Sequence, residues 1–161
     1  MSVIVCNAGP LIALAGVGQI PILRHLFRTV LVASEVRAEV EAGERTRAGA
    51  RLFDAAPWLQ VAELARPADR LLSSLLDAGE AATIALALER TAALVLIDEP
   101  KARRVARDVY HLAVVGTGRL LVEAKRAFLI GQVGPLIEQM RENGYWMGDK
   151  IVEAILREAG E

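Results

Sequence analysis

Residues 93–107, ALVLIDEPKARRVAR, contain the transition that decides the fold, because an apolar run stops at two adjacent carboxylates and a basic helix begins. Residues 94–97 are apolar without alternation, which is typical of a strand buried on both faces of a parallel sheet. Pro100 suits the first turn of the following helix. Asp98 is therefore expected at the carboxyl end of a strand, the edge where open α/β sheets place their sites.

The same pattern also fits a purely structural role for the acidic pair. A side-chain oxygen of Asp98 or Glu99 can accept a backbone N–H at the start of the helix that follows, where the helix dipole favours a negative charge. This segment alone leaves capping and chemistry equally open.

Strand and helix patterns alternate along the rest of the chain. Apolar or β-branched strands are predicted at residues 3–6, 29–32 and 113–115, and residues 58–61 fit a short edge strand or irregular chain. Ser34 is expected to cap a helix that Gly43 ends. Further helices are predicted at residues 21–27, 35–42, 69–76, 133–143 and 149–159, at 44–56 before Pro57, and in segments ending near Ala15, Leu88 and Ala127. This order predicts a three-layer α/β/α sandwich with a mainly parallel central sheet.

Composition limits the class of protein. A chain of 161 residues that is 53% hydrophobic can bury one sizeable core, so a single domain spanning residues 1–161 is expected. A net charge of −1 excludes a globally basic nucleic-acid binder but leaves room for a local basic surface. Cys6 is the only cysteine, which excludes an intramolecular disulfide and a cysteine zinc site. With no export signal and no apolar run of roughly 18 residues, we expect a cytoplasmic protein without membrane attachment.

The candidate chemistry is acidic. His25 and His111 stand in no convincing Ser-His-Asp grouping, so nucleophilic catalysis is disfavoured. Four oxygen-bearing side chains remain, at two strand ends and on two helices: Asn7, Glu39, Glu80 and Asp98. Oxygen ligands that converge suit Mg²⁺ or Mn²⁺, which activate water and neutralise phosphate charge.

Each of these side chains also has an ordinary structural role open to it. Asn7 can close an Asx turn, Glu39 can lie on a solvated helix rim, and Glu80 can favour the dipole of its own helix.

Several motifs together resemble a PIN-domain protein over nearly the whole chain. They are VIVCNAGPLIAL at 3–14, Glu39, GEAATIALA at 79–87, LIDEPKAR at 96–103 and VVGTGRLLVEAK at 114–125, and their order is similar to that of an uncharacterised PIN-like subgroup. The resemblance implies metal-dependent RNA cleavage with Mg²⁺ or Mn²⁺, often by the toxin of a toxin–antitoxin pair. It places Glu39, Glu80 and Asp98 at acidic, catalytic positions of the family's metal site, and Asn7 at the position of its first aspartate.

The chain departs from the family pattern at three positions. Asn7 is neutral, Gly9 replaces a hydroxyl residue, and Leu96 stands where a threonine often precedes the last acid. An amide oxygen can ligate a cation but adds no charge, so this site should hold metal less tightly than four carboxylates. Glu99 or Asp77 could supply the missing carboxylate, although Glu99 can do so only if the strand has already ended, since neighbouring strand residues point to opposite faces.

Basic residues follow the acidic pair. Lys101, Arg103, Arg104 and Arg107 could bind the RNA backbone, or they could simply form the solvated face of a helix.

The leading hypothesis is a ribonuclease in which a metal-bound water attacks the phosphodiester. The alternatives are a catalytically weakened PIN-like domain that binds RNA or an antitoxin-like protein without cleaving, and a nucleotide-binding regulator. The third is weakly supported, because Gly116-Thr117-Gly118 lacks the spacing of a Rossmann fingerprint and the lysine of a Walker sequence. A homodimer is expected, and Trp146 is expected either to cover the core or to form a dimer contact.

Overall fold

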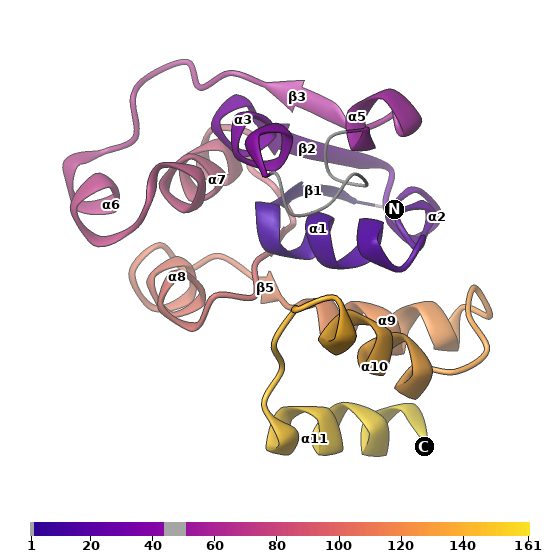
Figure 1. Ribbon diagram of the computed structural model, residues 1–161. Coiled ribbons are helices and arrows are strands. Elements are labelled where there is room, and N and C mark those ends of the chain that lie inside the picture. Colours follow the sequence, from indigo (N-terminus) through magenta and orange to yellow (C-terminus); the bar gives the residue numbers. More distant parts are fainter. Residues whose placement is uncertain (1, 44–50) are drawn as a thin grey trace.

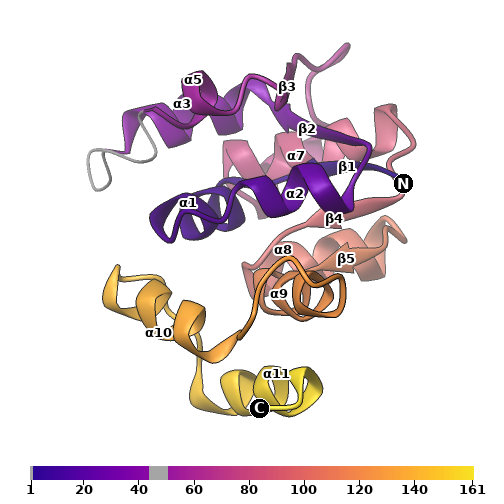
Figure 2. The same ribbon diagram turned by 90° about the vertical axis from the view of Figure 1, so that its right-hand side faces the viewer.

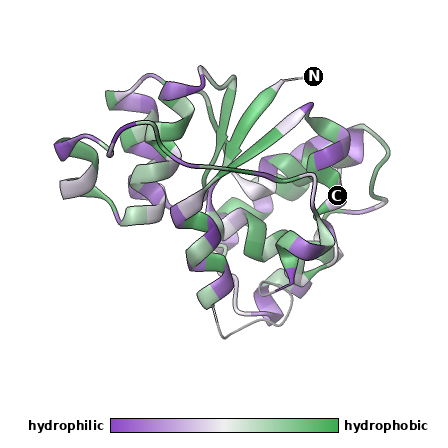
Figure 3. Ribbon diagram, turned by 90° about the horizontal axis from the view of Figure 1, so that it is seen from above, coloured by the Kyte–Doolittle hydropathy of each residue, from purple (hydrophilic) through white to green (hydrophobic). Residues whose placement is uncertain are grey.

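The computed structural model describes residues 2–43 and 51–161, and this part of the chain is built around a five-stranded sheet (Figure 1). All strand pairs are parallel, in the order β3-β2-β1-β4-β5. The strands are β1 (Val3–Cys6), β2 (Thr29–Ala33), β3 (Gln60–Ala62), β4 (Leu94–Leu96) and β5 (Val114–Val115). The strands are mostly hydrophobic (Figure 3), as expected when both faces of a parallel sheet are covered.

The pairing of β1 with β4 determines which residues meet at the carboxyl edge. Cys6 lies opposite Leu96, and the Asn7 N–H donates to the Leu96 carbonyl at 3.0 Å. Asn7 and the residues after Leu96 therefore leave the sheet side by side, as expected for a site at this edge.

Helices cover both faces of the sheet (Figure 2). The helices α1 (Ala8–Gly16) and α2 (Pro21–Leu26) lie on one face, and α7 (Ala78–Glu89) packs on β1, β2 and β4 from the other. The buried residues of α7 are mostly small, which allows close approach to the sheet. The other helical segments are α3 (Ser34–Ala42), α5 (Leu52–Ala55), α6 (Arg70–Leu75), α8 (Pro100–Arg104), the π-helical η1 (Val105–Val109), α9 (Thr117–Arg126), α10 (Gly134–Glu142) and α11 (Asp149–Ala159).

Helix α3 bridges the two layers at the carboxyl edge of the sheet. It begins directly after β2 and contacts both α1 and α7, which lie on opposite faces. This path carries Glu39 across the end of the sheet towards the start of α7.

The predicted α/β sandwich is confirmed, with local differences. Ser34 does not cap α3, because the helix begins at Ser34 itself and Ala33 is the N-cap, while the Ser34 hydroxyl donates to Glu35. The strand predicted to reach residue 97 ends at Leu96. The edge strand near residue 60 is present as β3, and most of the helix predicted over residues 44–56 lies outside the described residues.

No helix within residues 2–43 and 51–161 is both long enough and apolar enough to cross a membrane.

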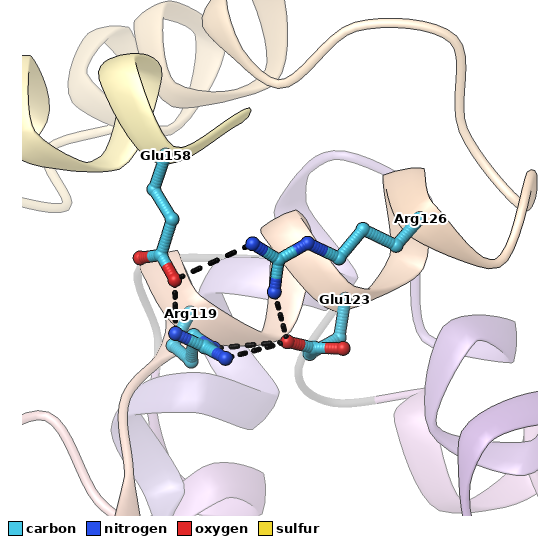
Figure 4. A network of polar contacts seen from close by, with 4 residues as sticks. All are labelled: Arg119, Glu123, Arg126 and Glu158. Carbon is cyan, nitrogen blue, oxygen red and sulfur yellow. Dashed lines mark hydrogen bonds and ion pairs between the residues drawn. The ribbon is translucent and has the colours of Figure 1, made fainter. Parts of the chain in front are cut away.

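The helices α9 and α11 pack closely at the far end of the chain. A Cβ on Gly118 would lie 2.1 Å from Ile155 Cδ1, so a larger residue at this position would displace the Ile155 side chain. At the surface, Glu123 and Glu158 share the guanidinium groups of Arg119 and Arg126 (Figure 4). These side chains are exposed, so each ion pair contributes little and the packing of the two helices supplies most of the stability.

The Glu161 side chain ties the end of α11 to the start of α10. Its Oε1 accepts from the Val133 N–H at 2.7 Å and from Lys125 Nζ at 2.8 Å, and its Oε2 accepts from the Gly134 N–H at 2.8 Å. Partial burial raises the pKa of Glu161, but the Lys125 ammonium and the two backbone donors outweigh it and hold the pKa at about 2.

We expect Glu161→Gln to lower the free energy of unfolding at neutral pH by about 1–3 kcal/mol, because an amide accepts these charge-assisted bonds less well. The folded pKa lies below the unfolded value, so the stabilisation is complete above pH 4.5 and is lost as pH falls towards about 2. Urea unfolding of both proteins along this range should show the difference shrinking. Glu153→Gln, an exposed change within α11, is the control, and an equal effect from it would contradict the assignment.

Candidate active site

One cleft at the carboxyl edge of the sheet brings together most of the residues predicted from the sequence. The ends of β1 and β4 contribute Asn7, Asp98 and Glu99, α3 contributes Glu39, and the start of α7 contributes Glu80. The remaining side chains of the cleft include Asp77, Arg103, Arg119, Tyr145, Trp146, Met147, Ile151 and Ile155. Segments that are far apart in the sequence therefore meet at one site.

Glu80 has a structural role at the start of α7. It forms a capping box with Asp77: Asp77 Oδ1 accepts from the Glu80 N–H at 2.8 Å, and Glu80 Oε2 accepts from the Asp77 N–H at 3.2 Å. Partial burial raises the pKa of Glu80, the Asp77 N–H opposes this, and the charges of Asp77, Glu99 and Glu39 raise it further. The helix-start role that the sequence left open is thus present, and Glu80 also belongs to a cluster of like charges.

Glu39 reaches the same helix start from α3. A Cβ on Gly79 would lie only 2.5 Å from Glu39 Oε2, so the carboxylate rests against a position that only glycine fits without displacing it. The Glu39 side chain is exposed, but protein atoms displace part of the water around its carboxylate. This desolvation is the main cause that raises the pKa of Glu39, and the negative charge of Asp77 raises it further. Glu39 therefore belongs to the cleft and not to a freely solvated helix rim.

Glu99 can face the cleft because the strand before it has already ended, as its proposed role as an additional carboxylate required. The strand β4 ends at Leu96, so the alternation of strand side chains no longer applies at Glu99, which lines the cleft. Its charge contributes to the raised pKa of Glu80. Glu99 and Asp77 both add negative charge beside the neutral Asn7.

Asp98 is the most hydrogen-bonded acid of the cleft. Its Oδ1 accepts from the Thr117 N–H at 2.7 Å, and its Oδ2 accepts from the hydroxyl groups of Thr117 and Tyr145. Neither Asp98 nor Glu99 caps α8 with its side chain. Asp98 instead satisfies the first N–H of α9, so the capping role suggested by the sequence exists but serves a helix that begins 19 residues later.

Asn7 is buried and makes no side-chain capping bond at the start of α1. Its Oδ1 lies 3.3 Å from the hydroxyl of Thr83, a buried residue of α7 that also donates to the Gly79 carbonyl at 2.8 Å. The Asx-turn role considered from the sequence is thus replaced by a contact with α7.

The donor set fits a hard cation in its chemistry. Every candidate ligand offers oxygen, and the cleft gathers Glu39, Asp77, Glu80, Asp98 and Glu99, whose negative charge a cation would neutralise. Within the part of the chain that the structure describes, however, no three His, Cys, Asp or Glu side chains are grouped closely enough to hold a metal ion. The carboxylates would have to turn towards an ion to ligate it together.

The predicted basic residues divide into two groups. Arg103 lines the cleft and donates from Nη1 to the Ile97 carbonyl at 2.8 Å. Lys101, Arg104 and Arg107 are exposed on α8 and η1 and do not line the cleft, and Arg107 pairs with Asp108 at 3.0 Å. Of the four predicted basic residues, only Arg103 is therefore placed beside the acidic cluster.

Three polar residues of the site were not identified from the sequence: Thr83, Thr117 and Tyr145. Burial raises the pKa of Tyr145, as do the charge and hydrogen bond of Asp98, so the phenol remains a donor at neutral pH. The Gly-Thr-Gly turn after a predicted strand was the one signal for Thr117, since strand ends gather at the same edge of a sheet.

A family model described as a PIN domain matches residues 3–161 of the chain. No curated protein matches the chain.

We expect Asp98→Asn and Tyr145→Phe each to lower the free energy of unfolding by about 1–3 kcal/mol, because each removes part of a charge-assisted hydrogen bond. The double variant should lose less than the sum of the two, since both changes break the same bond. Urea unfolding of the four proteins measures this coupling. Tyr110→Phe, which breaks a surface hydrogen bond to Asp69, is the matched control and should be additive with Asp98→Asn. Additive losses for Asp98 and Tyr145 would refute the link between them.

Proposed function

The chain belongs to the PIN-domain family, whose members are generally metal-dependent nucleases, and from this premise we propose that it is a metal-dependent endoribonuclease acting as the toxin of a toxin–antitoxin pair. The observation that carries the proposal is the meeting of Glu39, Glu80, Asp98 and Glu99 in one cleft at the carboxyl edge of the sheet. Their mutual repulsion is relieved when a cation binds among them.

Glu39, Glu80 and Asp98 would hold Mg²⁺ or Mn²⁺, with Glu99 and the Asn7 amide as further oxygen donors. A divalent cation held there supplies charge neutralisation at the phosphate and lowers the pKa of bound water. The protein's own contribution is to position these oxygens. The capping box holds Glu80 at the start of α7, the missing Cβ of Gly79 leaves room for Glu39, and Thr117 and Tyr145 hold Asp98. The carboxylates would turn from these positions towards an ion that they ligate together.

Arg103 is the residue best placed to bind the phosphate of the substrate. One guanidinium nitrogen is held by the Ile97 carbonyl, which orients the group beside the acidic cluster. Its other N–H groups can donate to phosphate oxygens, and a guanidinium is well suited to that geometry. Lys101, Arg104 and Arg107 would act at longer range, along the RNA that leaves the cleft.

The second candidate function is a weakened PIN domain that binds RNA or an antitoxin-like protein without cleaving. Two observations favour it: Asn7 contributes no charge, and both oxygens of Asp98 already accept hydrogen bonds. Under either function, we propose a cytoplasmic homodimer with a small antitoxin protein as a partner.

Glu80→Gln tests the proposed activity, because glutamine keeps an acceptor for the Asp77 N–H and removes only the charge. We expect it to lower Mn²⁺-dependent cleavage of single-stranded RNA by about 10- to 100-fold, as for the loss of a group that supports a metal site. Cleavage of a labelled RNA is measured with Mn²⁺ and with EDTA, and Glu153→Gln is the charge-matched control. Cleavage that survives EDTA, or is equal in the variant, would refute the metal-dependent mechanism.

Asn7→Asp separates the two candidate functions. Without metal, the added carboxylate should lower the melting temperature, since it joins a cluster of like charges. With Mn²⁺, the increase in melting temperature should be larger than in the wild type, through preferential binding to the folded state, and cleavage should rise. Gln139→Glu, an exposed change on α10 away from the cleft, controls for net charge. If the variant melts identically with and without Mn²⁺ and cleaves nothing, the binding function is favoured.

A further inference from the structure

Trp146 is an exposed aromatic side chain on the wall of the acidic cleft. It lies in the linker between α10 and α11, and 80% of its surface is exposed, so the expectation that it covers the core is wrong. Burying so large a ring is favourable, which makes an exposed tryptophan beside a candidate active site a candidate contact for a ligand.

The residues on both sides of Trp146 are anchored. The Tyr145 hydroxyl donates to Asp98, and the Met147 carbonyl accepts from Arg141 Nε at 3.2 Å and Nη2 at 2.6 Å. The Arg141 guanidinium also lies 5.7 Å from the centroid of the Trp146 ring, in a cation–π contact. The ring is thus held outwards in a defined place, which lowers the entropy cost of stacking a ligand on it.

We propose that Trp146 is a stacking platform for a base of single-stranded RNA whose phosphate lies in the acidic cleft. This inference rests on the proposed function, because it assumes that the cleft receives a phosphodiester. A strand that enters the cleft must run along its walls, and Trp146 is a wall residue of the same cleft as Glu39 and Glu80. Bases of a single strand offer free faces for stacking, whereas those of a duplex are already stacked on their neighbours.

The polar surroundings favour RNA over an apolar protein segment as the occupant. The ring is paired with a cationic guanidinium, and seven charged side chains, among them Arg103 and Arg119, line the cleft that it borders. Ile151 is the other strongly exposed apolar side chain of the cleft, with 60% of its surface exposed. Trp146 and Ile151 can therefore be compared directly, since a protein or a second copy of the chain would use both, whereas a base would stack only on the ring.

Intrinsic fluorescence provides the test, because the chain has only two tryptophans. In a Trp58→Phe background, Trp146 is the only tryptophan, and binding of an eight-nucleotide oligouridylate in Mg²⁺ should quench its emission. The affinity of each variant is measured by the anisotropy of the labelled RNA. We expect Trp146→Ala to weaken binding by about 10-fold, because it removes the ring, and Trp146→Phe to weaken it much less, because it keeps an aromatic face. Ile151→Ala should weaken binding by less than about 2-fold. Binding of a duplex RNA should not change in Trp146→Ala.

Cleavage is followed by gel in the same samples, which separates this inference from the proposed function. If RNA quenches the Trp146 fluorescence and Trp146→Ala weakens RNA binding, but no RNA is cleaved, the stacking platform is upheld and the nuclease is rejected. If the RNA is cleaved and Trp146→Ala binds it as tightly as the wild type, the nuclease is upheld and the stacking platform is rejected. Three results would each overturn the stacking platform. The first is that the wild type binds no RNA, and the second is that Ile151→Ala weakens RNA binding as much as Trp146→Ala does. The third is that the protein self-associates in sedimentation without RNA and its Trp146 fluorescence shows burial as concentration rises.

Discussion

The hydrogen bonds accepted by Asp98 join three parts of the chain that are distant in sequence. The end of β4, the first turn of α9 and the linker before α11 meet at one carboxylate, across separations of 19 and 47 residues. The approach is so close that a Cβ on Gly116 would lie 2.9 Å from Asp98 Oδ1 and 2.8 Å from Arg103 Nη1. One wall of the cleft therefore depends on the same side chain that the resemblance to PIN-domain proteins predicts to be catalytic.

The acidic cluster opposes this arrangement energetically. Partial burial, followed by the charge of Asp77, raises the pKa of Glu39. Partial burial, together with the charges of Asp77, Glu99 and Glu39, raises the pKa of Glu80, so ionising Glu39 and Glu80 at neutral pH costs folding free energy. The start of α7 offsets part of this cost, because its capping box and helix dipole stabilise negative charge. The repulsion that remains is one that a bound cation would relieve.

Much of the fold could be predicted because its signals are local. Unbroken apolar runs marked the buried strands, and residues at strand ends, such as Asn7 and Asp98, were correctly expected at one edge of a parallel sheet. The cap at Ser34 was wrong because Ala33 already has the extended backbone of an N-cap. Tyr145 and Thr83 could not be found, since their roles depend on packing between elements far apart in the chain, which periodicity does not encode.

The double role of Asp98 determines how variants of this site can be interpreted. A loss of activity on changing Asp98 would have two physical causes that act together: the loss of a proposed metal ligand and the release of Tyr145 with the wall that carries Trp146. Glu80 is free of this ambiguity, because its amide analogue keeps the capping bond to the Asp77 N–H while removing the charge. Evidence for metal-dependent chemistry is therefore stronger from Glu80 than from Asp98, although the sequence gives Asp98 the more prominent position.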